Sequence, residues 1–82
     1  MDLYNCLRLL NECIDAGLIQ RSPKFRNYIL IFRKGKDGAV EDCYEENLLV
    51  AAAELSKDVS DQKYLVEQLE AKSGKRFEVK AV

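Results

Sequence analysis

The 82-residue chain contains no histidine and no tryptophan, and it has one proline and four glycines. Without histidine it lacks the side chain that most often serves as a general base and as a transition-metal ligand. It also has no glycine-rich phosphate loop and no recognisable nucleophile motif. These absences count against an enzyme, and we expect no catalytic residue, no bound metal ion and no cofactor.

Long hydrophobic runs are absent as well. No apolar stretch approaches the roughly 18 residues of a membrane-spanning helix, so we expect no membrane segment. No basic region precedes an apolar stretch near Met1, so we expect no signal peptide and predict a cytoplasmic protein. Hydrophobic residues make up 48% of the chain and charged residues 33%, which is typical of a folded domain. The length predicts one domain over residues 1–82.

Cysteine is scarce and odd in number, with Cys6, Cys13 and Cys43 as its members. On a helix, Cys6 and Cys13 would lie about 10 Å apart along the axis, which is too far for a disulfide. We therefore expect three reduced, mostly buried thiols that act as small hydrophobic side chains.

Apolar residues recur at helical spacing from Leu3 to Ile14. This pattern predicts a helix over 2–16, which Asp2 caps at its start and Gly17 ends.

A continuous apolar run follows at 28–32, and its β-branched and aromatic residues favour a strand. Asp37-Gly38 is a strong turn signal, so residues 39–44 are expected to return as the second strand of a hairpin. Both faces of the first strand are apolar, which predicts a central strand covered on both sides by helices or by another copy of the chain.

Two further helices are expected after the hairpin. The first begins at 45–47, where acidic residues suit the positive end of a helix. The second is capped at its start by Asp58 or Ser60, runs to Ser73 and ends at Gly74. The strict alternation of apolar and polar residues over 76–82 predicts a half-buried last strand.

The predicted fold is therefore a small two-layer α+β domain with the order α-β-β-α-α-β. Its sheet is expected to be three-stranded, mainly antiparallel and packed on the helices. The expected core residues are Leu7, Leu10, Ile29, Ile31, Leu49, Ala52, Leu65, Leu69, Phe77 and Val79.

Charge is segregated along the chain, although the net charge is only −1. Residues 17–36 include six basic and no acidic side chains, whereas residues 37–61 include eight acidic side chains and one basic. The candidate basic binding patch consists of Arg21, Lys24, Arg26, Arg33, Lys34 and Lys36. The candidate acidic patch consists of Glu41, Asp42, Glu45 and Glu46.

Three interpretations of these charges are open. The basic residues bind phosphates, with Phe25 and Tyr28 stacking on bases. Alternatively, the two patches meet across a protein interface. In the third interpretation both are solvated surface, partly neutralised by pairs across the hairpin.

The leading prediction for function is a small, non-enzymatic protein-interaction module. Such a protein would act as an accessory, regulatory or inhibitory factor of the kind that phages and mobile elements encode. The alternative is a nucleic-acid-binding domain that uses the basic segment 21–36, which the near-zero net charge disfavours.

A homodimer is the expected form of self-association, because a chain this short buries a modest share of its surface and gains from a partner. The candidate interface consists of Tyr28, Leu30, Phe32 and Val79.

Overall fold

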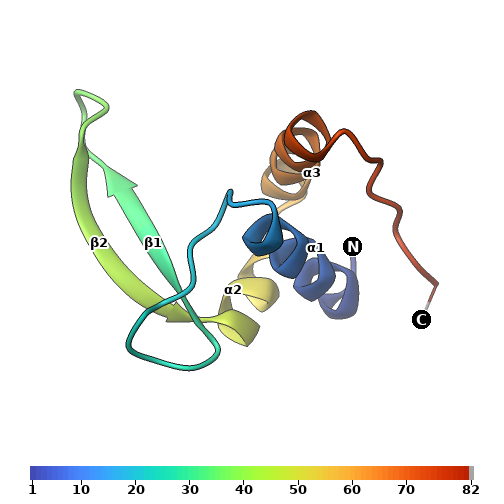
Figure 1. The fold of residues 1–82 in the computed structure, drawn as a ribbon, viewed down its shortest axis with the longest axis horizontal. Helices are drawn as coiled ribbons and strands as arrows, with labels where there is room; N and C mark the ends of the chain where they lie inside the picture. The colour runs from blue at the N-terminus through green and yellow to red at the C-terminus, as the bar shows by residue number, and fades with distance from the viewer. Residues whose placement is uncertain (82) are drawn as a thin grey trace.

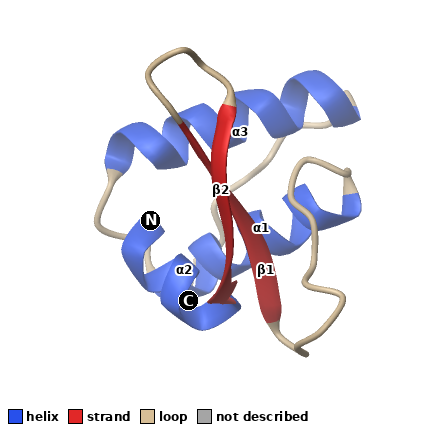
Figure 2. Ribbon diagram, turned by 90° about the vertical axis from the view of Figure 1, so that its left-hand side faces the viewer, coloured by secondary structure: helices blue, strands red, loops and turns tan. Residues whose placement is uncertain are grey.

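The fold is a β-hairpin set beside three helices, which confirms the α+β class (Figure 1). The structure is a computed structural model, and it describes residues 1–81 apart from the side chain of Lys34. Its elements in chain order are α1 (Leu3–Asp15), β1 (Tyr28–Lys34), β2 (Val40–Asn47), α2 (Leu48–Leu55) and α3 (Val59–Ser73). Figure 2 shows the hairpin crossing in front of the helices.

Polar caps set the ends of the first and third helices, close to where the sequence predicts them. The Asp2 carboxylate accepts a 2.9 Å hydrogen bond from the backbone N–H of Asn5. The Asp58 carboxylate does the same for the N–H of Asp61 at 3.1 Å. Gly74 ends α3 with a φ of 72°, in the left-handed region that a residue without a Cβ enters at little cost.

The hairpin pairs β1 and β2 in antiparallel register, and its turn lies where the Asp-Gly signal predicts it. Gly38 has a φ of 82°, and its N–H donates to the Gly35 carbonyl at 3.1 Å. An irregularity between Arg33 and Lys34 shifts the register near this turn.

The junction between β2 and α2 differs from the predicted one. Residues 45–47, expected to begin the helix, form the end of the strand, because Glu45, Glu46 and Asn47 pair with β1. Asn47 then serves directly as the N-cap of α2, and its side-chain oxygen accepts from the N–H groups of Leu49 and Val50. Strand and helix thus meet without a loop.

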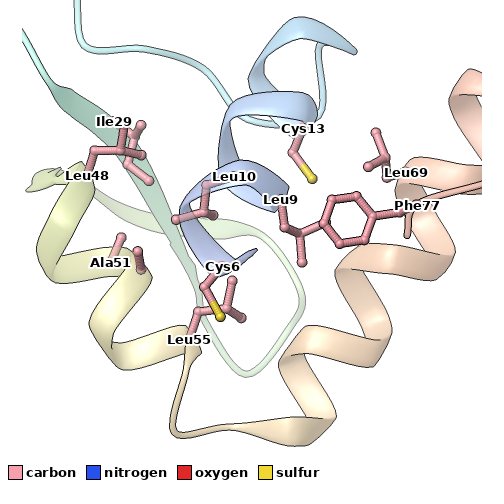
Figure 3. Packing of buried hydrophobic residues seen from close by; sticks show 11 residues of the cluster. Cys6, Leu9, Leu10, Cys13, Ile29, Leu48, Ala51, Leu55, Leu69 and Phe77 are labelled. Carbon is pink, nitrogen blue, oxygen red and sulfur yellow. The ribbon is translucent and has the colours of Figure 1, made fainter. Parts of the chain in front are cut away.

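The core is centred on α1, which lies between α2 and α3 (Figure 3). Leu9 is fully buried and faces Phe77 and Leu69, while Leu10 faces Ile29 of β1 and the residues of α2. The buried hydrophobic residues are Cys6, Leu9, Leu10, Cys13, Ile29, Leu48, Ala51, Ala52, Leu55, Leu69 and Phe77.

The core prediction is correct for five of its ten residues, because Leu10, Ile29, Ala52, Leu69 and Phe77 are buried. Leu7, Ile31 and Leu65 pack against this core but are only partly buried, so the prediction of core positions holds for them in part. Leu49 and Val79 are instead exposed, at 57% and 59% of their surface. Leu49 lies on the outer side of α2, because the buried face of that helix consists of Leu48, Ala51, Ala52 and Leu55 at helical spacing.

The predicted third strand is not confirmed, and within residues 1–81 the sheet has two strands. Residues 76–81 run alongside α1, not beside the hairpin (Figure 1). Side chains of the helices hold this segment: the Asn5 amide accepts from the Lys80 N–H at 2.8 Å and donates to its carbonyl at 2.9 Å. The Glu70 carboxylate accepts from the Phe77 N–H at 2.8 Å. Val82, the last residue of the predicted strand, lies outside the described residues.

Candidate functional site

A groove separates β1 from the helices α2 and α3. It has a volume of about 710 Å³ and is open to solvent. Apolar side chains form its floor, and the groove continues along β1 as far as Phe32, which is 51% exposed. The floor residues are Leu10, Leu18, Ile19, Ile29, Ile31, Leu55 and Leu65.

The shape of the groove follows from how the hairpin is attached. At its base Ile29 packs into the core beside Leu48, so β1 is held against the helices (Figure 3). Towards its tip the hairpin projects away from α3 (Figure 1). Phe32 on β1 and Tyr64 on α3 therefore remain exposed on the two sides of the groove.

Four carboxylates line the rim of the groove: Glu46, Glu54, Asp58 and Asp61. They come from β2, from α2 and from the start of α3. Among the side chains that the structure describes, the ion pairs are Arg8 with Glu12 and Arg33 with Asp42. None of the rim carboxylates takes part in either pair, so the groove has a net negative rim.

Glu46 is a partly buried rim carboxylate that lies close to a second one, Glu54. Burial raises the pKa of its carboxyl group above the ordinary value, and the nearby negative charge of Glu54 raises it further. A cation held between these two side chains would favour their charged forms by electrostatic attraction.

The predicted acidic patch is divided between the two faces of β2. Asp42 and Glu46 share one face and Glu45 lies on the other, because strand residues alternate, whereas Glu41 is the residue without a partner at the register shift. Glu45 accepts a 2.9 Å hydrogen bond from the Ser22 hydroxyl. Of these four residues, Glu46 alone lines the groove.

The other three rim carboxylates were not among the site residues predicted from the sequence. Glu54 lies near the end of α2, and Asp58 and Asp61 lie at the start of α3. In the sequence these three residues are visible only as part of the acidic excess over 37–61. They come together at one rim because of the turn between α2 and α3, which the sequence pattern does not specify.

The predicted basic patch falls into two groups at the two ends of β1. Arg21, Lys24 and Arg26 are exposed in the loop before the strand. Arg33, Lys34 and Lys36 lie at the hairpin tip, where Arg33 pairs with Asp42 at 3.4 Å. Seven strand residues span about 20 Å between the groups, so they do not form one continuous basic surface. The Phe25 and Tyr28 rings, whose centroids are 5.6 Å apart, lie with the first group.

The candidate interface residues are likewise separated. Tyr28, Leu30 and Phe32 share one face of β1, and Leu30 and Phe32 also line the groove. Val79 belongs to the segment beside α1, at the opposite end of the molecule from the hairpin (Figure 1).

The three thiols occupy two kinds of environment. Cys6 and Cys13 are buried in the core, as expected, and burial raises the pKa of Cys13 to about 11. Cys43 is exposed on β2, contrary to the expectation that the thiols would be mostly buried. Within residues 1–81, no cluster of three Cys, Asp or Glu side chains is placed to hold a metal ion.

None of the described helices combines the length and the apolar character needed to cross a membrane. Comparison of the chain with protein-family models, with curated proteins and with solved structures gives no match.

Proposed function

We propose that this protein is a small, non-enzymatic interaction module that binds a segment of another protein in the groove between β1 and α2–α3. The observation that supports this proposal is the combination of an open apolar floor with a rim of carboxylates that pair with no described cation. Apolar floors with charged rims are the usual composition of protein interfaces.

Two aromatic side chains strengthen the case for a protein partner. Phe32 and Tyr64 stand on opposite sides of the groove, each with more than half of its surface exposed. Aromatic residues of this kind often supply a large share of binding energy when a partner covers them.

The finer expectations from the sequence belong to this proposal. They are an accessory, regulatory or inhibitory role, a cytoplasmic location, and a homodimer whose interface consists of Tyr28, Leu30, Phe32 and Val79. Such a homodimer would compete with a partner segment for Leu30 and Phe32, which line the groove. Sedimentation equilibrium at micromolar concentration tests the homodimer, because a dimer doubles the mass of the 9.4 kDa chain. Nucleic-acid binding through 21–36 receives less support, since its basic side chains lie at two separate ends of β1.

A pair of tyrosine variants tests the proposed function. Tyr64→Ala removes the exposed ring at the edge of the groove without changing the charge, at a position exposed enough to preserve the fold. Tyr4→Ala is the matched control, because Tyr4 is an exposed tyrosine on α1 outside the groove.

The wild type and both variants are tagged and incubated with extract of the source organism, and the captured proteins are purified. The binding of each captured protein to the wild type and to the two variants is then measured by titration and by amide chemical shifts. We expect a partner whose affinity falls about tenfold or more with Tyr64→Ala and is unchanged with Tyr4→Ala. Its binding should shift the signals of Ile31 and Leu65. If the two variants bind alike, or if the shifts lie outside the groove, the proposal is wrong.

A further inference from the structure

The outer edge of β1, the edge turned away from β2, is paired along only half of its length. The N–H of Leu30 donates to the Gln20 carbonyl at 2.9 Å, and the N–H of Ser22 donates to the Tyr28 carbonyl at 2.9 Å. Residues 20–22 thus lie beside the first half of β1, with an isolated bridge between Arg21 and Ile29.

Phe32 belongs to the unpaired half of this edge. Backbone groups of alternate strand residues point to the same side, so the N–H and C=O of Phe32 point outward as those of Tyr28 and Leu30 do. The chain has by then turned away, because Leu18 and Ile19 donate to the Cys13 carbonyl at the end of α1. Among the described residues, no backbone group outside the hairpin bonds to Phe32.

This free edge borders the groove. Leu30, Ile31 and Phe32 line it from the strand side, and Tyr64 and Leu65 line it from α3. Figure 1 shows β1, not β2, on the side of the hairpin that faces α3. A chain segment in the groove would therefore lie next to unpaired backbone groups, and exposed strand edges are templates for such pairing.

The negative charge of the rim indicates which side chains a bound chain segment would carry. Glu46, Glu54, Asp58 and Asp61 lie around the apolar floor, and the structure places no described cation against them. Lysine or arginine side chains meet this requirement, provided that apolar side chains alternate with them to cover the floor.

We propose, building on the proposed function, that the partner binds as an extended, basic segment that adds a third strand to the outer edge of β1. Its backbone pairs with Phe32, its apolar side chains cover Ile31 and Leu65, and its basic side chains meet the carboxylates of Glu54 and Asp58. Backbone pairing supplies affinity in this mode of recognition, and the side chains supply specificity.

Proline substitutions on the two edges of the hairpin test the backbone pairing. Phe32→Pro removes an N–H that points away from β2, so the hairpin ladder is kept while the outer edge of β1 is blocked. Cys43→Pro is the matched control, because Cys43 is the cross-strand neighbour of Phe32 on the opposite edge. The Cys43 N–H donates to the Asp42 carboxylate and so lies outside the ladder. Phe32→Ala removes the ring alone and serves as the reference for Phe32→Pro.

The probe is an acetylated peptide in which lysine and valine alternate over about eight residues, a usual strand length. A second peptide has glutamate in place of lysine. Fluorescence anisotropy measures the affinity of each peptide for the full-length wild type and for the three variants. Hydrogen exchange of the Phe32 amide is followed in the wild type with and without peptide.

The lysine peptide is expected to bind the wild type more weakly as salt is raised, and the glutamate peptide to bind at least about tenfold more weakly. Phe32→Pro should weaken binding about tenfold or more relative to Phe32→Ala, while Cys43→Pro leaves it within about threefold of the wild type. The Phe32 amide should become protected from exchange in the complex.

Equal affinities of Phe32→Pro and Phe32→Ala would overturn strand addition, as would an equal loss with Cys43→Pro. If neither peptide binds while capture still depends on Tyr64, the inference fails and the proposed function stands. If capture of the partner from extract does not depend on Tyr64, the proposed function itself is wrong. If the wild type self-associates and Phe32→Pro abolishes this self-association, the occupant of the groove is a second copy of this chain. That result would also overturn the inference.

Discussion

Replacement of Leu9 by alanine measures how much stability the core around α1 contributes. Leu9 is fully buried and faces Phe77 and Leu69, so its side chain joins α1 to α3 and to the C-terminal segment. The substitution removes the equivalent of about three methylene groups, which costs about 2.4 kcal/mol in transfer free energy. The cavity left behind adds to this cost, and leucine-to-alanine changes in protein cores span about 2–5 kcal/mol.

We therefore expect Leu9→Ala to lower the free energy of unfolding by about 3 kcal/mol. A domain of this size has a total stability of roughly 4–12 kcal/mol, so the loss is a large part of the whole. Urea denaturation followed by circular dichroism measures the change through the shift in midpoint at constant slope. Thermal unfolding should show a fall in Tm of about 12–24 °C.

Leu49→Ala provides the control for this prediction. The sequence pattern predicts that Leu49 belongs to the core, whereas the structure exposes 57% of its surface. We expect its replacement to cost less than about 1 kcal/mol, because little apolar surface returns to water. Equal losses for Leu9→Ala and Leu49→Ala would refute the assignment of the helix faces described here.

Three further predictions concern single polar or titratable groups. Asn5→Ala removes the buried amide that bonds both backbone groups of Lys80. We expect the free energy of unfolding, measured by urea denaturation, to fall by about 1–3 kcal/mol and hydrogen exchange at the Lys80 amide to become faster. Unchanged exchange at that amide would contradict the assigned contact. The raised pKa of Glu46 means that the folded state binds its proton more tightly than the unfolded state, so stability falls as pH rises from about 4.5 through the raised pKa of the folded state. Relative to the wild type, Glu46→Gln should therefore gain stability above this window and not below it, as urea midpoints at several pH values would show. Cys43 should react with a thiol reagent in the folded protein, because its side chain is exposed. Cys13 should react only on unfolding, because it is buried and its pKa is about 11. Similar reaction rates for the two thiols would show that the core is open to the reagent.

The elements that rest on local signals could be predicted from the sequence. The first helix was expected over 2–16 and spans Leu3–Asp15, since the Asp2 cap and the apolar spacing act within a few residues. The hairpin turn at Asp37-Gly38 is equally local, because glycine readily adopts the positive φ that the turn requires.

Residues 45–47 and 76–81 were assigned wrongly because their structure depends on distant partners. The acidic residues at 45–46 suit a helix start, but pairing with β1 keeps them in the strand up to Asn47. Alternation over 76–82 is typical of a strand, yet the side chains of Asn5 and Glu70 take the hydrogen bonds that a sheet would otherwise provide.

The sequence by itself determined the α+β class, the first helix, the hairpin and an excess of acidic residues after the basic segment. Each of these follows from spacing, capping or composition within a short stretch of chain. Only the tertiary structure decided that β1 keeps a free outer edge beside an acidic groove. That arrangement depends on where β1, α2 and α3 meet in space, because side chains far apart in the chain, such as Phe32 and Tyr64, become neighbours across the groove only after these elements pack.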